Sequence, residues 1–257
     1  MISAIAAQMM LMGAGSPPPS RYYTPFFASG EQGIVLDFQD LSTLFQDSGA
    51  SVPVTTAGQS IVSAKDKLSS NLCVFTGTAP TLQFDSTNNV YFAQFPSGGG
   101  AHGTVSVPTA LNGNANKSIL AVCTLGGPSI NETPLLYGTN ATIGCFAMGN
   151  GTSIMGGFAV FEQGAGHGIG GASIAAGSYV ICGTKNNTSL AVYANSSTAY
   201  ASGSTIGAAN ITTNTLNVGF YPSLGGVDFQ GSMYSAVLIN RVLTTAEIGA
   251  AVSGRYA

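Results

Sequence analysis

The sequence predicts an all-β domain of the sandwich type, closed by one short helix. Three observations lead to this fold class. About a dozen short apolar runs follow Gly33 and are separated by Gly, Pro, Asn and Ser, which is typical of strands joined by turns. A single helix-start signal follows the last run, and 257 residues are enough for one large domain with a full core. No fixed repeat occurs, which disfavours a solenoid or a propeller.

The strands are expected in order along the chain. Residues 40–45 interrupt them with one helical turn, for which Asp40 is placed as the N-cap. Residues 117–125 are continuously apolar, which indicates a strand buried on both faces. The Gly-rich segments 97–103 and 164–172 are expected to be loops. The expected strands are 33–38, 72–75, 81–84, 90–95, 104–108, 117–125, 142–148, 156–162, 178–184, 189–195, 215–220 and 231–240. A four-residue polar loop is expected to join 178–184 to 189–195 as a hairpin.

The end of the chain carries the sharpest local signal. Thr244 and Glu247 have the spacing of a capping box, in which each satisfies a backbone amide of the first helical turn. Leu243 and Ile248 have the spacing of a hydrophobic staple. We therefore expect a short helix from Thr245 to about residue 252.

Composition excludes several classes of protein. Charged residues are only 7% of the chain and the net charge is −3, so a nucleic-acid binder with a basic patch is not expected. No run reaches the length of a membrane span. A soluble monomer usually carries more surface charge, so we expect neighbouring subunits to cover much of the surface. The alternative is a secreted bacterial surface protein whose Ser, Thr and Asn side chains are solvated.

The first 30 residues are expected to form an arm that docks on a partner, and residues 31–257 to form the sandwich domain. The arm begins with an apolar stretch, and a proline triplet precedes a group of aromatic residues. The alternative for residues 1–15 is that they pack on their own domain, and the alternative for the aromatic group is that it plugs the base of the domain. The residues expected to dock are Met9, Met10, Leu11, Met12, Tyr22, Tyr23, Phe26 and Phe27.

The four cysteines lie in apolar contexts and form no CxxC pair, so we expect four small buried hydrophobic residues. One or two disulfides stay open as an alternative.

The C-terminal part resembles the end of laminin-G-like, concanavalin-type jelly rolls. The resemblance rests on GSMYSAVLINRVLTTAEI at residues 231–248, with the runs 178–184 and 189–195 as the preceding hairpin. It implies a concanavalin-like jelly-roll β-sandwich, here with an extended N-terminal arm and a short C-terminal helix.

A second resemblance lies in residues 33–61, where DLSTLFQD is followed by PVT and GQ. This segment is similar to one in bacteriophage virion proteins that carry such a jelly roll. The resemblance implies a non-enzymatic structural protein on the exterior of the phage particle, as a capsid decoration or a head or neck fibre held by its arm. The implied partners are other virion proteins of the capsid, neck or tail, and further copies of the chain in an oligomer such as a trimer.

Few residues suit catalysis or metal binding, so we expect no enzyme, no catalytic residue and no cofactor. Asp228 is the one late carboxylate that fits a calcium site, and a turn residue is the preferred interpretation. The rival function is a glycan-binding adhesin of a tail fibre or a bacterial surface. Its expected aromatic contacts with the sugar are Tyr91, Tyr137, Tyr200 and Tyr221.

Overall fold

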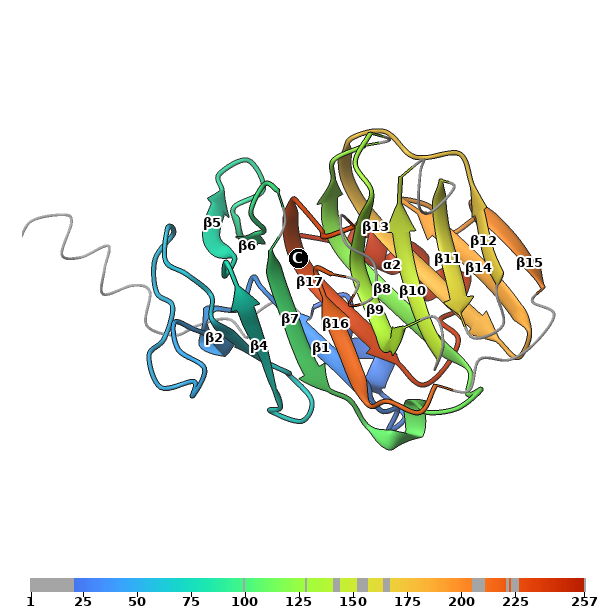
Figure 1. The fold of residues 1–257 in the computed structure, drawn as a ribbon, viewed down its shortest axis with the longest axis horizontal. Helices are drawn as coiled ribbons and strands as arrows, with labels where there is room; N and C mark the ends of the chain where they lie inside the picture. Colours follow the sequence, from blue (N-terminus) through green and yellow to red (C-terminus); the bar gives the residue numbers. More distant parts are fainter. Residues whose placement is uncertain are drawn as a thin grey trace, which may run out of the picture.

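Two antiparallel sheets packed face to face make up the protein in the computed structural model (Figure 1). The structure describes residues 21–98, 100–127, 129–140, 144–151, 157–163, 167–204, 211–220, 222 and 227–256. The all-β sandwich and the short C-terminal helix expected from the sequence are confirmed. Within the described residues, no helix is both long and apolar enough to cross a lipid bilayer.

One sheet has eight strands, and β17 pairs with three of them. The second half of β17 pairs with β1 on one side, while β8 lies along its other side. The strands follow in the order β15 (Ala201–Ser204), β14 (Ser189–Ala194), β13 (Gly177–Asn186), β8 (Lys117–Leu125), β17 (Ser232–Ile239), β6 (Val90–Gln94) and β5 (Thr81–Asp85), with β1 (Gly33–Asp37) joined to β17.

The other sheet has nine strands and also pairs strands from distant parts of the chain. Its strands follow in the order β12 (His167–Gly171), β11 (Phe158–Gln163), β10 (Gly144–Asn150), β9 (Glu132–Asn140), β16 (Thr215–Val218), β7 (Ala101–Ser106), β4 (Leu72–Gly77), β3 (Ser63–Lys65) and β2 (Leu44–Phe45). Three 3-10 turns accompany the strands: η1 (Thr24–Phe27), η2 (Leu41–Thr43) and η3 (Thr109–Leu111).

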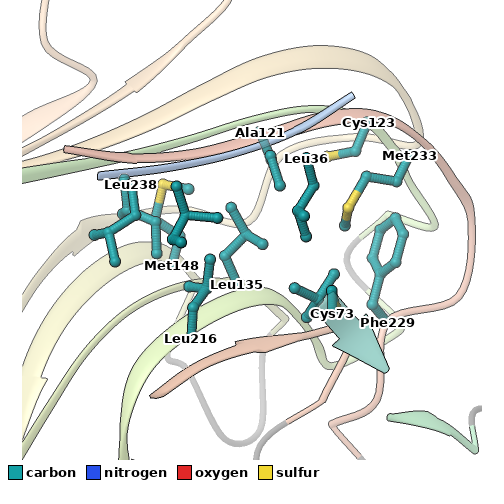
Figure 2. Close-up of a cluster of buried hydrophobic side chains, with 14 of the residues drawn as sticks. Leu36, Cys73, Ala121, Cys123, Leu135, Met148, Leu216, Phe229, Met233 and Leu238 are labelled. Carbon is teal, nitrogen blue, oxygen red and sulfur yellow. The ribbon is translucent and has the colours of Figure 1, made fainter. Parts of the chain in front are cut away.

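The main core fills the space between the sheets because alternate strand residues point to the same face. Figure 2 shows Ala121, Cys123 and Leu238 of the eight-stranded sheet facing Leu135 and Met148 of the other sheet. All four cysteines of the chain are buried and none forms a disulfide, so the expectation of buried apolar cysteines is confirmed.

A second cluster lies on the outer face of the eight-stranded sheet. Alternate residues such as Leu120, Val122 and Val237 point outward there and need a cover. Helix α2 (Thr245–Ser253) and the aromatic residues of segment 21–27 provide it. The capping box of Thr244 and Glu247 is present as predicted.

The aromatic part of the expected arm belongs to this cluster, which corrects the docking prediction for three residues. Tyr22, Tyr23 and Phe26 are buried within their own domain, and Phe27 packs against the same cluster. The Tyr22 hydroxyl shares a 2.7 Å hydrogen bond with Ser235 Oγ. The aromatic segment 21–27 therefore packs on the sandwich rather than extends from it. The docking residues Met9, Met10, Leu11 and Met12 lie outside the described residues.

Several strands were not predicted. The expected loops 97–103 and 164–172 contain the start of β7 and all of β12, because glycines accept extended backbone when the neighbouring strand supplies hydrogen bonds. Strands β9, β3 and β15 were also missed. The hairpin of β13 and β14 is tighter than expected: Ser189 pairs directly with Asn186, and Asn187 adopts a positive φ of 54° in the turn.

The three aspartates of the segment 33–61 have local structural roles. Asp37 accepts a hydrogen bond from the Tyr23 hydroxyl at 2.7 Å. Asp40 caps η2 by accepting from the Ser42 amide at 3.0 Å, as predicted. Asp47 accepts from the amide of Val52 at 2.8 Å and closes the following turn. The aspartate spacing of this segment therefore serves the fold.

Candidate functional site

The outer face of the eight-stranded sheet is covered in the middle and hollowed on both sides. Helix α2 and segment 21–27 lie over β1, β8 and β17, where the second hydrophobic cluster is found. One hollow lies over β13, β14 and β15, and the other lies near the turn between β5 and β6. The two differ in chemistry.

The first hollow, called the hydroxyl groove here, has a volume of about 400 Å³. Its lining consists of uncharged residues, most of them small or hydroxyl-bearing. The lining residues are Thr184, Asn186, Ser189, Leu190, Ala191, Tyr193, Ser202, Gly203, Ser204 and Val242.

Strand register explains why these residues meet. Thr184 of β13 lies opposite Ala191 of β14, which in turn lies opposite Ser202 of β15. Two residues along, Asn186, Ser189 and Ser204 form a parallel row across the same three strands. Because side chains alternate between faces with a period of two, both rows face outward. Small side chains in both rows leave the sheet surface hollow.

Tyr193 is the aromatic member of the groove. It follows Ala191 on the outward face of β14 and packs partly against the second hydrophobic cluster. Burial raises the pKa of its phenol above the usual range, and a side-chain hydrogen bond with Thr184 opposes that shift. Tyr193 is therefore a neutral hydroxyl at physiological pH, held by packing on one side and open to the groove on the other.

The second hollow, called the arginine pocket here, has a volume of about 300 Å³. Unlike the hydroxyl groove, it contains a cation. Its lining residues are Arg21, Gln39, Asn88, Asn89, Val90, Tyr91 and Tyr256.

A third polar cluster lies where β7 begins. The His102 ring stacks on Phe220, with 4.4 Å between ring centroids, and its Nε2 lies 3.3 Å from Asp228 Oδ2. The same oxygen accepts a hydrogen bond from the Gly100 amide at 3.2 Å. Asp228, the weak calcium candidate, is thus occupied by a ring nitrogen and an amide. Among the described residues, no three His, Cys, Asp or Glu side chains are grouped to hold a metal ion.

The tyrosines predicted to contact a glycan are not brought together. Tyr91 lines the arginine pocket. Tyr137 is fully buried in the core and donates a 2.8 Å hydrogen bond to Asn112, so its expected role is wrong. Tyr200 is 42% exposed, but its hydroxyl is bound to Ala172 O and it lines neither hollow. Tyr221 lies outside the described residues.

Several buried ionisable residues, among them Lys117, Lys185 and Glu132, line neither hollow. Lys117 and Lys185 sit opposite each other on β8 and β13 and are fully buried, with carbonyl oxygens as acceptors of their ammonium groups. Glu132 is fully buried near the start of β9, and burial raises its pKa to about 8.

Sequence reasoning missed Tyr193 and the serines of the groove. The signal was present: polar or small residues recur with period two at Ser189, Ala191 and Tyr193, and again at Ser202 and Ser204. It was overlooked because segment 201–204 was not assigned as a strand.

Solved structures with a similar fold include proteins that act on carbohydrates. No family model and no curated protein matches the sequence. Domain 4 of AbnA, a GH43 extracellular arabinanase from Geobacillus stearothermophilus solved in complex with arabinotriose, is 12% identical. The match covers 85% of this chain and 97% of that one, with a TM-score of 0.58.

Two further neighbours are larger proteins. A GH54 α-L-arabinofuranosidase soaked with a cyclic sulfate inhibitor is 10% identical, with a TM-score of 0.64 over 87% of this chain. Trypanosoma rangeli sialidase in complex with the inhibitor DANA is 13% identical, with a TM-score of 0.50 over 84% of this chain. The match spans only 62% and 36% of those two chains.

These comparisons contradict the function expected from the sequence. We expected a non-enzymatic structural protein of a phage particle, whereas the similar solved structures described above are an arabinofuranosidase, a sialidase and a domain of an arabinanase. The expectation that the chain is no enzyme is contradicted by the same finding. The resemblance of residues 33–61 to phage proteins, and the partners, oligomer and virion location that it implies, are tested by none of these matches and stay predictions.

Proposed function

We propose that this domain binds carbohydrate and that the hydroxyl groove holds a neutral oligosaccharide. The observation that carries the proposal is the groove itself: an open hollow of about 400 Å³ lined by hydroxyl and amide side chains around a tyrosine. None of the described residues that line it is charged.

The chemistry of the lining suits a sugar on both of its surfaces. Sugar hydroxyls are donors and acceptors at once, and Ser, Thr and Asn side chains offer both roles. The apolar C–H face of a sugar ring packs on an aromatic ring, for which Tyr193 is placed. Each hydrogen bond to a neutral hydroxyl contributes only about 0.5–1.5 kcal/mol, so several must act together. The groove supplies five such polar side chains around Tyr193: Thr184, Asn186, Ser189, Ser202 and Ser204.

The comparisons support the ligand class. The arabinanase domain that this chain covers almost completely was solved with arabinotriose, an uncharged sugar. Glycoside hydrolysis mostly requires two carboxyl groups beside the cleaved bond. No carboxyl group occurs among the described residues that line the hydroxyl groove, so the role that we assign to this groove is binding.

A glycan array followed by calorimetric titration of the best neutral oligosaccharide tests the proposal. Tyr193→Ala is expected to weaken binding about tenfold or more, because stacked aromatic area and its packing are lost. Tyr193→Phe keeps the ring and is expected to retain most of the affinity. Ser202→Ala removes one hydroxyl and is expected to weaken binding by a factor of about 2 to 10.

Tyr200→Ala is the matched control, since this tyrosine is exposed and lies outside the groove. It is expected to bind like the parent chain. Absence of any saturable neutral ligand on the array overturns the function. If Tyr193→Ala is folded, as checked by thermal unfolding, and its affinity is unchanged, the ligand does not bind in the hydroxyl groove.

A further inference from the structure

The arginine pocket carries chemistry that the hydroxyl groove lacks. Arg21 lines it together with the amides of Asn88 and Asn89 and the ring of Tyr256. These residues come from the start of the described chain, from the turn between β5 and β6, and from the segment after α2. A cation, amides and an aromatic ring therefore meet in one hollow of about 300 Å³.

The guanidinium of Arg21 is held in place from behind. Its Nε lies 3.3 Å from Asp37 Oδ2, and its Nη1 donates to Gln39 Oε1 at 3.1 Å. The Asp37 side chain is only 1% exposed, whereas that of Arg21 is 24% exposed. A ligand in the pocket thus meets the positive group, while the opposite charge lies beneath it. Such a fixed cation loses little conformational freedom on binding.

The opposite wall of the pocket is also fixed. Tyr256 packs edge-on against Tyr234 with 5.1 Å between ring centroids, and the Arg255 guanidinium lies 5.2 Å from the Tyr256 ring. On the β5–β6 turn, Asn88 donates to Asp85 at 2.6 Å, and Asn89 adopts a positive φ of 57°. Asn88, Asn89 and Tyr256 thus line the same hollow, and Asn88 and Tyr256 are held by contacts outside it.

We propose that the arginine pocket is a second ligand site, which takes a sugar bearing a carboxylate. Guanidinium groups bind carboxylates through paired, charge-assisted hydrogen bonds. The amides of Asn88 and Asn89 suit the hydroxyls of the same sugar, and Tyr256 suits its C–H face. One guanidinium that already shares its charge with Asp37 matches a single negative charge better than a dianionic phosphate. This site is independent of the hydroxyl groove and of its proposed ligand.

The test compares a matched acid and neutral pair on the full chain. Calorimetry with oligogalacturonate and with the equivalent oligogalactose is expected to show binding of the acid about tenfold or more tighter than the neutral sugar. Raising NaCl from about 50 mM to about 500 mM is expected to weaken the binding of the acid, because the contact is partly exposed. Inorganic phosphate is the third probe and is expected to bind more weakly than the acid sugar.

Variants locate the site. Arg21→Gln is expected to remove the preference for the acid, and Tyr256→Ala to weaken binding of the acid without disturbing the Asp37 pair. Ser202→Ala, in the hydroxyl groove, is expected to leave binding of the acid unchanged. Thermal unfolding checks that each variant is folded. If Arg21→Gln fails to fold, the proposal is tested by the affinity of Tyr256→Ala and by the ratio of the affinities of the parent chain for the acid and the neutral sugar. Equal affinity for both sugars, tighter binding of phosphate, or loss of acid binding in Ser202→Ala each overturns the proposal.

Discussion

Glu132→Gln is expected to remove a large pH dependence from the stability of this protein. Glu132 is fully buried, and its Oε1 accepts a hydrogen bond from the Gly126 amide at 2.8 Å. Its Oε2 has no hydrogen-bond partner within the part of the chain that the structure describes. Burial has the largest effect on this carboxyl and raises its pKa to about 8, although hydrogen bonds from the amides of Gly126 and Gln230 oppose the shift. The folded state thus prefers the neutral acid.

The magnitude follows from the two pKa values. The folded state holds a proton on Glu132 up to about pH 8, whereas the unfolded chain releases it near pH 4.5. Between these values the folded state binds more protons, so the free energy of unfolding falls as the pH rises. At 1.36 kcal/mol per unit, the loss reaches about 4 kcal/mol by pH 8, as an order of magnitude. Below pH 4.5 both states are protonated and this contribution is fully retained.

Urea unfolding across this pH range measures the effect. Glu132→Gln keeps the accepting oxygen and cannot ionise, so its stability is expected to stay nearly level from pH 4.5 to 8 while that of the parent chain falls. Glu31→Gln is the control: hydrogen bonds from backbone amides and the nearby Arg241 lower the pKa of this half-buried carboxyl, so its contribution changes only in acid. Parallel pH curves for the parent chain and Glu132→Gln would refute the reasoning.

Three further outcomes are expected. Hydrogen bonding from Arg241 lowers the pKa of Glu247 to about 2, so this pair stabilises the protein above pH 4.5 and is lost as the pH falls toward 2; Glu247→Gln should flatten that acid limb in urea unfolding. Gly103→Ala should destabilise the protein by about 1–3 kcal/mol, because the new methyl would lie 2.6 Å from the Phe75 ring. Gly249 lies in α2, and a methyl group added there would meet Ser197 at 3.6 Å and nothing closer; Gly249→Ala should therefore stabilise the protein by up to about 1 kcal/mol. A stabilised Gly103→Ala or a destabilised Gly249→Ala, measured by the same unfolding, would contradict the packing described.

Local features of the fold were predictable from sequence because their causes are local. Asp40 caps η2 through an amide two residues away. Thr244 and Glu247 cap α2 across three residues. Strand β8 was found because an almost continuous apolar run needs burial on both faces. Strand β12 was missed because it is Gly-rich and obtains its order from pairing with β11, which no local pattern records.

The candidate site was less accessible to sequence reasoning. The sequence pattern around an aromatic residue on a strand does not show which face of the sheet its side chain occupies. Tyr137 lies in the core, whereas Tyr193 lies on an open face. The group at 22–27 looked suited to a partner, but the apolar outer face of β8 and β17 needed a cover and these rings are close in sequence to β1. Which surface covers which ring depends on long-range packing.

By itself, the sequence determined the all-β class, the two caps and the apolar alternation, since each depends on neighbours within one turn or on a period of two. Only the tertiary structure decided where ligands can bind. The hydroxyl groove needs the register of three strands, whose outward rows no other described segment fills. The arginine pocket needs Arg21, Asn88 and Tyr256 to meet from three distant segments. Both depend on which parts of a sheet face the rest of the chain leaves open, and that is a property of the whole fold.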